Sequence, residues 1–126
     1  MKAAAQRLTA AEALLRVRLT LDAQYLAGYT IECSLKSLIM HLTPDDAKLN
    51  TLQKITRSAT MHLPDTLFGL LHNLGVSRPL ELTIRLRRVG WSTELRCEVG
   101  RLDFGETRAF LNTAKAIYTW VEDQLP

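Results

Sequence analysis

The sequence predicts an all-α protein, an antiparallel helical bundle of four long helices plus one or two short ones. Three observations lead to this fold class. Apolar side chains recur at helical spacing in several segments, and prolines and glycines lie near the ends of most of them. The chain has 126 residues, of which 47% are hydrophobic and 23% are charged, values typical of a globular protein. A single domain of residues 1–126 can therefore build its own core.

The first helix is predicted over about residues 4–18, where Leu8, Ala11 and Leu15 share one face. Charged residues interrupt its apolar runs: Arg7, Glu12, Arg16 and Arg18. The segment is therefore neither a signal-peptide core nor a membrane-spanning helix. From this pattern we expect a cytoplasmic protein with no membrane association.

A central helix is predicted over residues 21–42, because this segment has so little polar surface. Large aliphatic side chains and one glycine form one stripe along it, and small side chains form a second. The first stripe is Leu21, Gly28, Ile31, Leu35, Ile39 and Leu42, and the second is Ala23, Ala27, Thr30, Ser34 and Ser37. Small residues let a neighbouring helix approach closely, and Gly28 fits the same interpretation. The short link before this helix predicts an antiparallel pair with the first.

Four aromatic or charged side chains share a further face of the central helix: Tyr25, Tyr29, Glu32 and Lys36. Glu32 and Lys36 are four residues apart with the acid first, the favourable order for an ion pair. Buried charges must be paired or hydrogen-bonded, so this stripe is either an internal polar network or the wall of a ligand-binding cleft. Trp91 and Arg96 are the candidates for joining it from a loop.

Prolines and glycines divide the next part of the chain. Short helices are predicted over residues 44–55 and 64–73, the second closed by Gly75. Residues 79–90 fit a helix with Pro79 in its first turn. Their leucines and isoleucine also alternate with polar residues, as in a strand. A small β-hairpin over residues 80–99 is therefore the alternative for this region.

The last helix is predicted from Asp103 or Gly105 to Gln124. Apolar side chains recur along one of its faces: Phe110, Ala114, Ile117, Val121 and Leu125. This helix completes the expected bundle.

Charge and cysteine content narrow the classes of function. The formal net charge is +3, too small to indicate nucleic-acid binding by itself. Seven arginines and five acids share residues 78–108, which fits either a solvated surface or a surface that binds a polyanion or partner. Cys33 and Cys97 form no CxxC pair or Cys/His cluster, so we expect free thiols, no metal site and no cofactor. Cys33 has no histidine near it in sequence, which argues against a nucleophile.

Of the three histidines, His41, His62 and His72, the second is the strongest candidate for chemistry. Arg57 precedes His62 by five positions, so the two side chains could form an acid-base and phosphate-binding pair. The competing interpretation is that His62 bonds to the N-terminus of the helix that follows it. The sequence leaves both open.

Four segments together resemble the HEPN superfamily, the higher eukaryotes and prokaryotes nucleotide-binding domains. The most specific is YLAGYTIECSLKSLI at residues 25–39; weaker similarities lie at 62–67, 91–97 and 109–125. The resemblance implies an all-helical, dimeric protein, and the superfamily includes ribonuclease toxins, partners of small nucleotidyltransferases and antiviral defence components. Its ribonucleases carry an arginine and a histidine near the start of the last long helix. Here Arg101 and Arg108 lie there, but no histidine follows His72.

These observations predict a non-catalytic HEPN-like interaction module that forms a homodimer. The resemblance implies a nucleotidyltransferase-type protein, a nucleotide or RNA as its partner, in a toxin-antitoxin or defence system. No catalytic residue is assigned on this interpretation. The alternative is a metal-independent endoribonuclease that uses Arg57 and His62.

Overall fold

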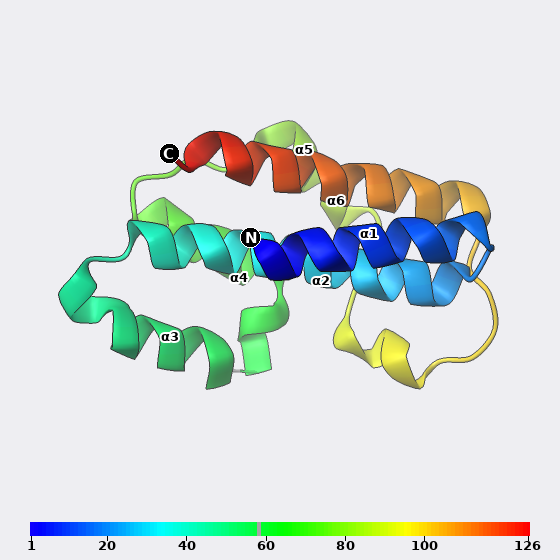
Figure 1. Ribbon diagram of the computed structural model, residues 1–126, viewed down its shortest axis with the longest axis horizontal. Coiled ribbons are helices and arrows are strands. Elements are labelled where there is room, and N and C mark those ends of the chain that lie inside the picture. Colours follow the sequence, from blue (N-terminus) through cyan, green and yellow to red (C-terminus); the bar gives the residue numbers. More distant parts are fainter. Residues whose placement is uncertain (58) are drawn as a thin grey trace.

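Three long helices lie side by side in the computed structural model, which describes residues 1–57 and 59–126 (Figure 1). They are α1 (Lys2–Arg16), α2 (Thr20–Leu42) and α6 (Phe104–Gln124). α1 is antiparallel to α2, as expected, whereas α6 runs in the same direction as α2 (Figure 1). The predicted all-α bundle is confirmed, and the described residues contain no strand.

Three short helices and three 3-10 turns make up the rest of the described fold. The helices are α3 (Lys48–Arg57), α4 (Pro64–Asn73) and α5 (Leu80–Arg87), and the turns are η1 (Asp45–Ala47), η2 (Ala59–His62) and η3 (Thr93–Cys97). Only α1, α2 and α6 are long, so the fourth long helix expected from the sequence is replaced by short segments. Proline and glycine at positions such as 79 and 90 limit how far these segments extend.

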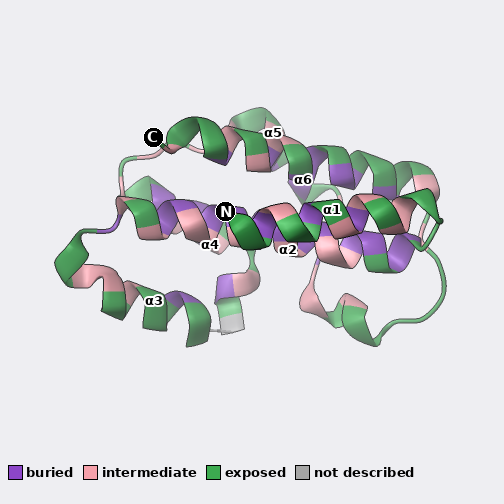
Figure 2. Ribbon diagram, viewed as in Figure 1, coloured by how far each residue is buried: buried purple, intermediate pink, exposed green. Residues whose placement is uncertain are grey.

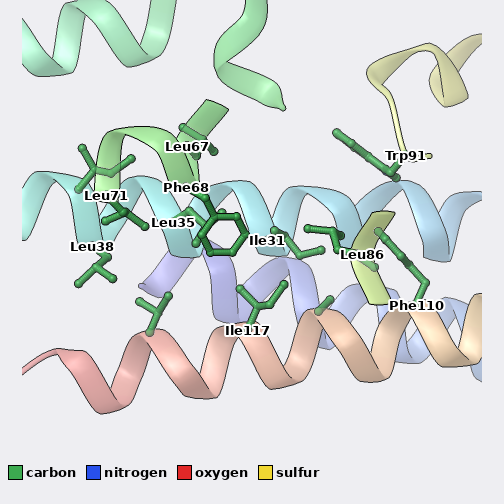
Figure 3. Packing of buried hydrophobic residues seen from close by; sticks show 14 of the residues in the cluster. Ile31, Leu35, Leu38, Leu67, Phe68, Leu71, Leu86, Trp91, Phe110 and Ile117 are labelled. Atoms are coloured by element: carbon green, nitrogen blue, oxygen red, sulfur yellow. The ribbon is translucent and has the colours of Figure 1, made fainter. Parts of the chain in front are cut away.

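α2 is the centre of the core, and both of its predicted stripes are largely buried (Figure 2). Side chains from α4 and α6 gather around its aliphatic stripe (Figure 3). The side chains labelled there include Ile31, Leu35 and Leu38 of α2, Phe68 and Leu71 of α4, and Ile117 of α6. Ala4, Leu8 and Ala11 provide the buried face of α1.

Hydroxyl groups on α2 are tolerated inside the bundle because they bond within their own helix. The hydroxyl of Ser34 donates to the carbonyl of Thr30 at 2.7 Å, and that of Thr43 donates to the carbonyl of Ile39 at 2.7 Å. Thr30 and Ser37 bond in the same way four residues back. These bonds satisfy polar atoms that would otherwise be buried without a partner.

Two helices end with a residue in the left-handed backbone conformation. Gly75 ends α4 with a φ of 88°, which confirms the glycine terminator predicted from the sequence. Arg18 occupies the same position after α1 with a φ of 61°. The amide of Arg18 donates to the carbonyl of Leu15, and that of Leu19 to the carbonyl of Leu14. Together these bonds form a Schellman motif in which glycine would be usual.

The β-hairpin alternative for residues 80–99 is wrong, because α5 and η3 occupy this region. A strand would place Leu80, Leu82, Ile84 and Leu86 on one face. The helix instead buries Thr83 and Leu86, three residues apart, and leaves Leu80 69% exposed. The hydroxyl of Thr83 donates to the carbonyl of Pro79, which satisfies it inside the helix.

α3 lies apart from the three long helices, on the same side of α2 as η2 and η3 (Figure 1). Ile55 is its only buried residue among those described, while Leu49 is 67% and Leu52 44% exposed. This helix therefore carries an apolar surface that the described part of the chain does not cover.

Candidate functional site

The predicted stripe on α2 forms a polar and aromatic cluster with side chains from two loops. Glu32 is at its centre and is only 6% exposed. The Nζ of Lys36 lies 2.6 Å from the Oε1 of Glu32, and the Nδ1 of His62 lies 3.0 Å from the same oxygen. One buried carboxylate oxygen therefore holds two basic side chains, one from its own helix and one from η2.

The ion pair with Lys36 is what makes the burial of Glu32 acceptable. A carboxylate removed from water costs several kcal/mol unless a nearby positive charge and hydrogen bonds compensate. Lys36 is itself largely buried, so the pair is shielded from solvent more than a surface pair would be. The second oxygen of Glu32, Oε2, is buried and has no hydrogen-bond partner in the described residues.

His62 fastens η2 to α2 through Glu32. The side chain of His62 is 38% exposed, and its contact with Glu32 fixes the orientation of the ring. α4 begins after Leu63 with no side-chain cap in the described residues, so the expectation that His62 caps this helix is wrong. Pro64 at the start of α4 has no amide hydrogen, which reduces the number of donors that need a cap.

Trp91 covers the other end of the stripe and packs directly on Gly28. A Cβ atom added to Gly28 would lie 1.9 Å from Cε2 of the indole, so only glycine allows this contact. The ring of Trp91 also lies 6.3 Å from that of Tyr25 and 5.5 Å from that of Tyr29, measured between centroids. The close packing predicted at Gly28 is present, but the neighbour is an indole from a loop rather than another helix.

The two tyrosines are linked to each other and to the charged end of the cluster. Their hydroxyl oxygens lie 3.3 Å apart, with Tyr25 donating to Tyr29. Burial, followed by the interactions with Tyr25 and the charge of Glu32, raises the pKa of Tyr29 to about 12. The positive charge of Arg96 lowers the pKa of Tyr29. Tyr29 is therefore a neutral hydroxyl at physiological pH.

Arg96 and Arg57 do not join the cluster by direct contact. Arg96 is exposed on η3, and no hydrogen bond or ion pair connects it to Glu32 in the described residues. Arg57 is exposed at the last residue of α3. Across residues 1–57 and 59–126, no hydrogen bond or ion pair links Arg57 to His62. The arginine-histidine pair considered in the sequence stays a prediction, because two basic side chains can approach one phosphate without bonding to each other.

The partner of His62 is the functional contact that the sequence interpretation missed. Glu32 and His62 are 30 positions apart, and no local spacing links them. One signal was available in the sequence: the carboxylate of a buried Glu32 can accept more hydrogen bonds than Lys36 alone donates. A donor from elsewhere in the fold was thus required, although the sequence did not say which.

This region offers little support for a reactive thiol or a metal site. Burial raises the pKa of the Cys33 thiol, and the adjacent Glu32 raises it further, so the reactive thiolate is disfavoured. In the described part of the chain, no group of three His, Cys, Asp or Glu side chains could hold a metal ion. Nor does any described helix have the length and apolarity to cross a membrane.

No known protein family matches the chain, and neither a curated protein nor a solved structure matches it. Function must therefore be inferred from the residues of this chain. The cluster offers one oriented histidine, one buried ion pair and a packed group of aromatic rings. This arrangement can hold loops in place and present a polar surface.

Proposed function

We propose that this chain is a non-catalytic, HEPN-like helical interaction module that works as a homodimer in the cytoplasm. Its partner would be a nucleotidyltransferase-type protein, a nucleotide or RNA, in a toxin-antitoxin or defence system. The helical bundle around α2 is compatible with the resemblance of residues 25–39 to the superfamily. The partner classes follow from that resemblance alone.

One observation carries the non-catalytic part of the proposal: the Nδ1 of His62 lies 3.0 Å from the Oε1 of Glu32. The contact with Glu32 uses the Nδ1 of His62 to hold η2 against α2, which is a structural task. A general acid-base pair for RNA cleavage would need both side chains at one reacting phosphate. The described residues contain no hydrogen bond or ion pair between Arg57 and His62, and the bond of His62 to Glu32 supports a binding role.

The exposed face of α3 supports self-association. Leu49 and Leu52 are one helical turn apart and both exposed. Asp45 and Asp46 precede α3, where Asp45 pairs with Lys48 at 3.0 Å and Asp46 has no ion pair in the described residues; the last turn of α3 is basic, with Lys54 and Arg57. Two copies of α3 packed antiparallel about a two-fold axis would cover the leucines and bring acidic and basic ends together. The same surface therefore provides both an apolar centre and matching charges.

Sedimentation equilibrium of the purified chain tests the homodimer. We expect the wild-type protein to be dimeric and the Leu49→Glu/Leu52→Glu variant to be monomeric. Leu80→Glu is the control, because Leu80 is 69% exposed, close to the 67% of Leu49, but lies on α5. A wild-type monomer at every concentration would overturn the homodimer. A dimer that survives the double change, or is lost equally in the control, would overturn the α3 interface.

A metal-independent ribonuclease is the second candidate, and one observation favours it. A buried carboxylate orients the ring of His62 through Nδ1 and leaves the partly exposed Nε2 without a partner in the described residues. Catalytic histidines are commonly oriented by a carboxylate in this way. On this candidate, Arg57 of a second copy would supply the positive charge.

A further inference from the structure

A cavity of about 490 Å³ lies between α2, α5 and α6, away from the cluster around Glu32. α5 packs along α6 near this point (Figure 1). The volume of the cavity is in the range of about 300–1,000 Å³ that is typical of small-molecule sites. The polar side chains that line it are Gln24, Arg85, Arg88, Glu106, Asn112 and Thr113.

Two arginines and one carboxylate, Glu106, line the cavity, so positive charge is in excess there. Arg85 lies on α5 and Arg88 directly follows its end, three positions later, and neither forms an ion pair within residues 1–57 and 59–126. The arginines nearby behave differently, because Arg78 and Arg87 both pair with Asp65, at 3.0 and 3.2 Å. No ion pair joins Glu106 to Arg85 or Arg88 in the described residues. Two adjacent guanidinium groups are suited to a phosphate.

Gln24 supplies a buried and oriented hydrogen-bonding group at the same cavity. It is 8% exposed, and its Oε1 accepts a hydrogen bond from the hydroxyl of Thr107 at 3.3 Å. That bond uses the acceptor of the amide and leaves the two donors of its nitrogen without a partner in the described part of the chain. The amide nitrogen is not among the buried atoms that lack a partner, so it is accessible and can donate to a ligand with an acceptor.

The other residues that line the cavity indicate a ligand that carries a further chemical group besides a phosphate. Asn112 offers both a donor and an acceptor, and Glu106 offers acceptors for hydroxyl groups. The ring of Phe110 is buried and forms an apolar wall. We propose that this cavity binds a small phosphate monoester with a hydroxylated neutral part, a sugar phosphate or a nucleotide. Arg85 and Arg88 hold the phosphate, and Gln24, Asn112 and Glu106 hold the neutral part.

Isothermal titration calorimetry with ribose 5-phosphate, adenosine 5′-monophosphate, inorganic phosphate and ribose tests this site. We expect saturable binding of at least one phosphate monoester with a Kd below about 1 mM, and weaker binding of phosphate or ribose alone. The monoester that binds more tightly shows whether the ligand class is a sugar phosphate or a nucleotide. No saturable binding of either monoester, or equally tight binding of inorganic phosphate, would overturn the proposal.

Variants connect the binding to the cavity. Arg85→Ala and Arg88→Ala should each weaken binding of the monoester by about tenfold or more, because each removes charge-assisted hydrogen bonds. Arg87→Ala is the matched control: it removes the same charge from the same helix, but Arg87 does not line the cavity. Gln24→Leu should also weaken binding, with folding checked by thermal unfolding. Equal losses in the control and the two arginine variants would overturn the site. Neither result depends on the oligomeric state of the chain.

Discussion

Gly28 lies beneath the indole of Trp91, and the contact leaves no room for a side chain. Gly28→Ala would force the indole to move, since the new Cβ would overlap its ring. We expect a loss of about 1–3 kcal/mol in the free energy of unfolding, the usual cost of overpacking. Urea denaturation followed by circular dichroism measures this change.

The same substitution in a Trp91→Ala background provides the control. Without the indole, an alanine in the middle of α2 should be neutral or stabilising by up to about 1 kcal/mol, because alanine favours helix over glycine. The coupling between the two positions is then the energy of the overlap. An equal loss in both backgrounds would show that Trp91 is not the cause.

Tyr29 gives the cluster a measurable dependence on pH. Its pKa is raised in the folded state to about 12 from the ordinary value of 10.0, first by burial and then by Tyr25 and Glu32. The unfolded chain therefore loses the proton at a lower pH than the folded one. The stabilisation is complete below pH 10 and is lost as the pH rises to about 12.

Ultraviolet titration of tyrosinate tests this prediction. The wild-type protein should contain a tyrosine that ionises near pH 12, and Tyr29→Phe should remove that step. The loss of stability at high pH should be smaller in the same variant. Titration of Tyr29 at its ordinary pKa of 10.0 in the folded protein would contradict its burial.

At the residue level, the sequence predicted local contacts better than distant ones. The pair Glu32 and Lys36 was foreseen because positions four apart meet on one helix face. The contact of Glu32 with His62 was not foreseen, because it depends on where η2 folds back. Arg96 was expected at the cluster, and its charge acts on Tyr29 without a direct bond to Glu32.

The turn between α1 and α2 places Arg18 in a backbone conformation that suits glycine. Its guanidinium lies over the ring of Phe104, 4.5 Å from the centroid, which offsets part of the conformational cost. Arg18→Gly and Arg18→Ala both remove this contact, but only glycine relieves the backbone. In urea denaturation, we expect the free energy of unfolding of Arg18→Gly to exceed that of Arg18→Ala by about 1 kcal/mol. Equal stability would contradict the left-handed conformation.

Among the helices, boundaries were predicted best where proline or glycine mark them. The bounds of α4 agree with the sequence because Pro64 begins the helix and Gly75 follows its end. The helix predicted for α5 is confirmed, although alternation of apolar residues over eight positions also fitted a strand. Its packing against α6 decides the outcome, and the sequence of α5 alone does not contain that information.

At the scale of the whole molecule, the arginines around α5 fall into two groups, those that form ion pairs and those that line the cavity. Arg78 and Arg87 share Asp65, whereas Arg85 and Arg88 face the cavity between α5 and α6 without a pairing acid in the described residues. The sequence showed that arginines are numerous in this region but not which of them form ion pairs. α3 adds an exposed apolar face on the opposite part of the fold from α6 (Figure 1). The surface features that support partner binding are therefore distinct from the cluster at Glu32.

RNA cleavage by purified protein in the presence of a metal chelator tests the central claim, that His62 has a structural and not a catalytic role. The wild type, Arg57→Ala and His62→Ala should all show no cleavage above a mock preparation, because His62 is bound to Glu32 without Arg57. His62→Ala should still lower the free energy of unfolding, since it removes the tie between η2 and α2. Wild-type cleavage that both changes abolish, with unfolding and oligomeric state intact, would contradict the account and assign the active site to these two residues.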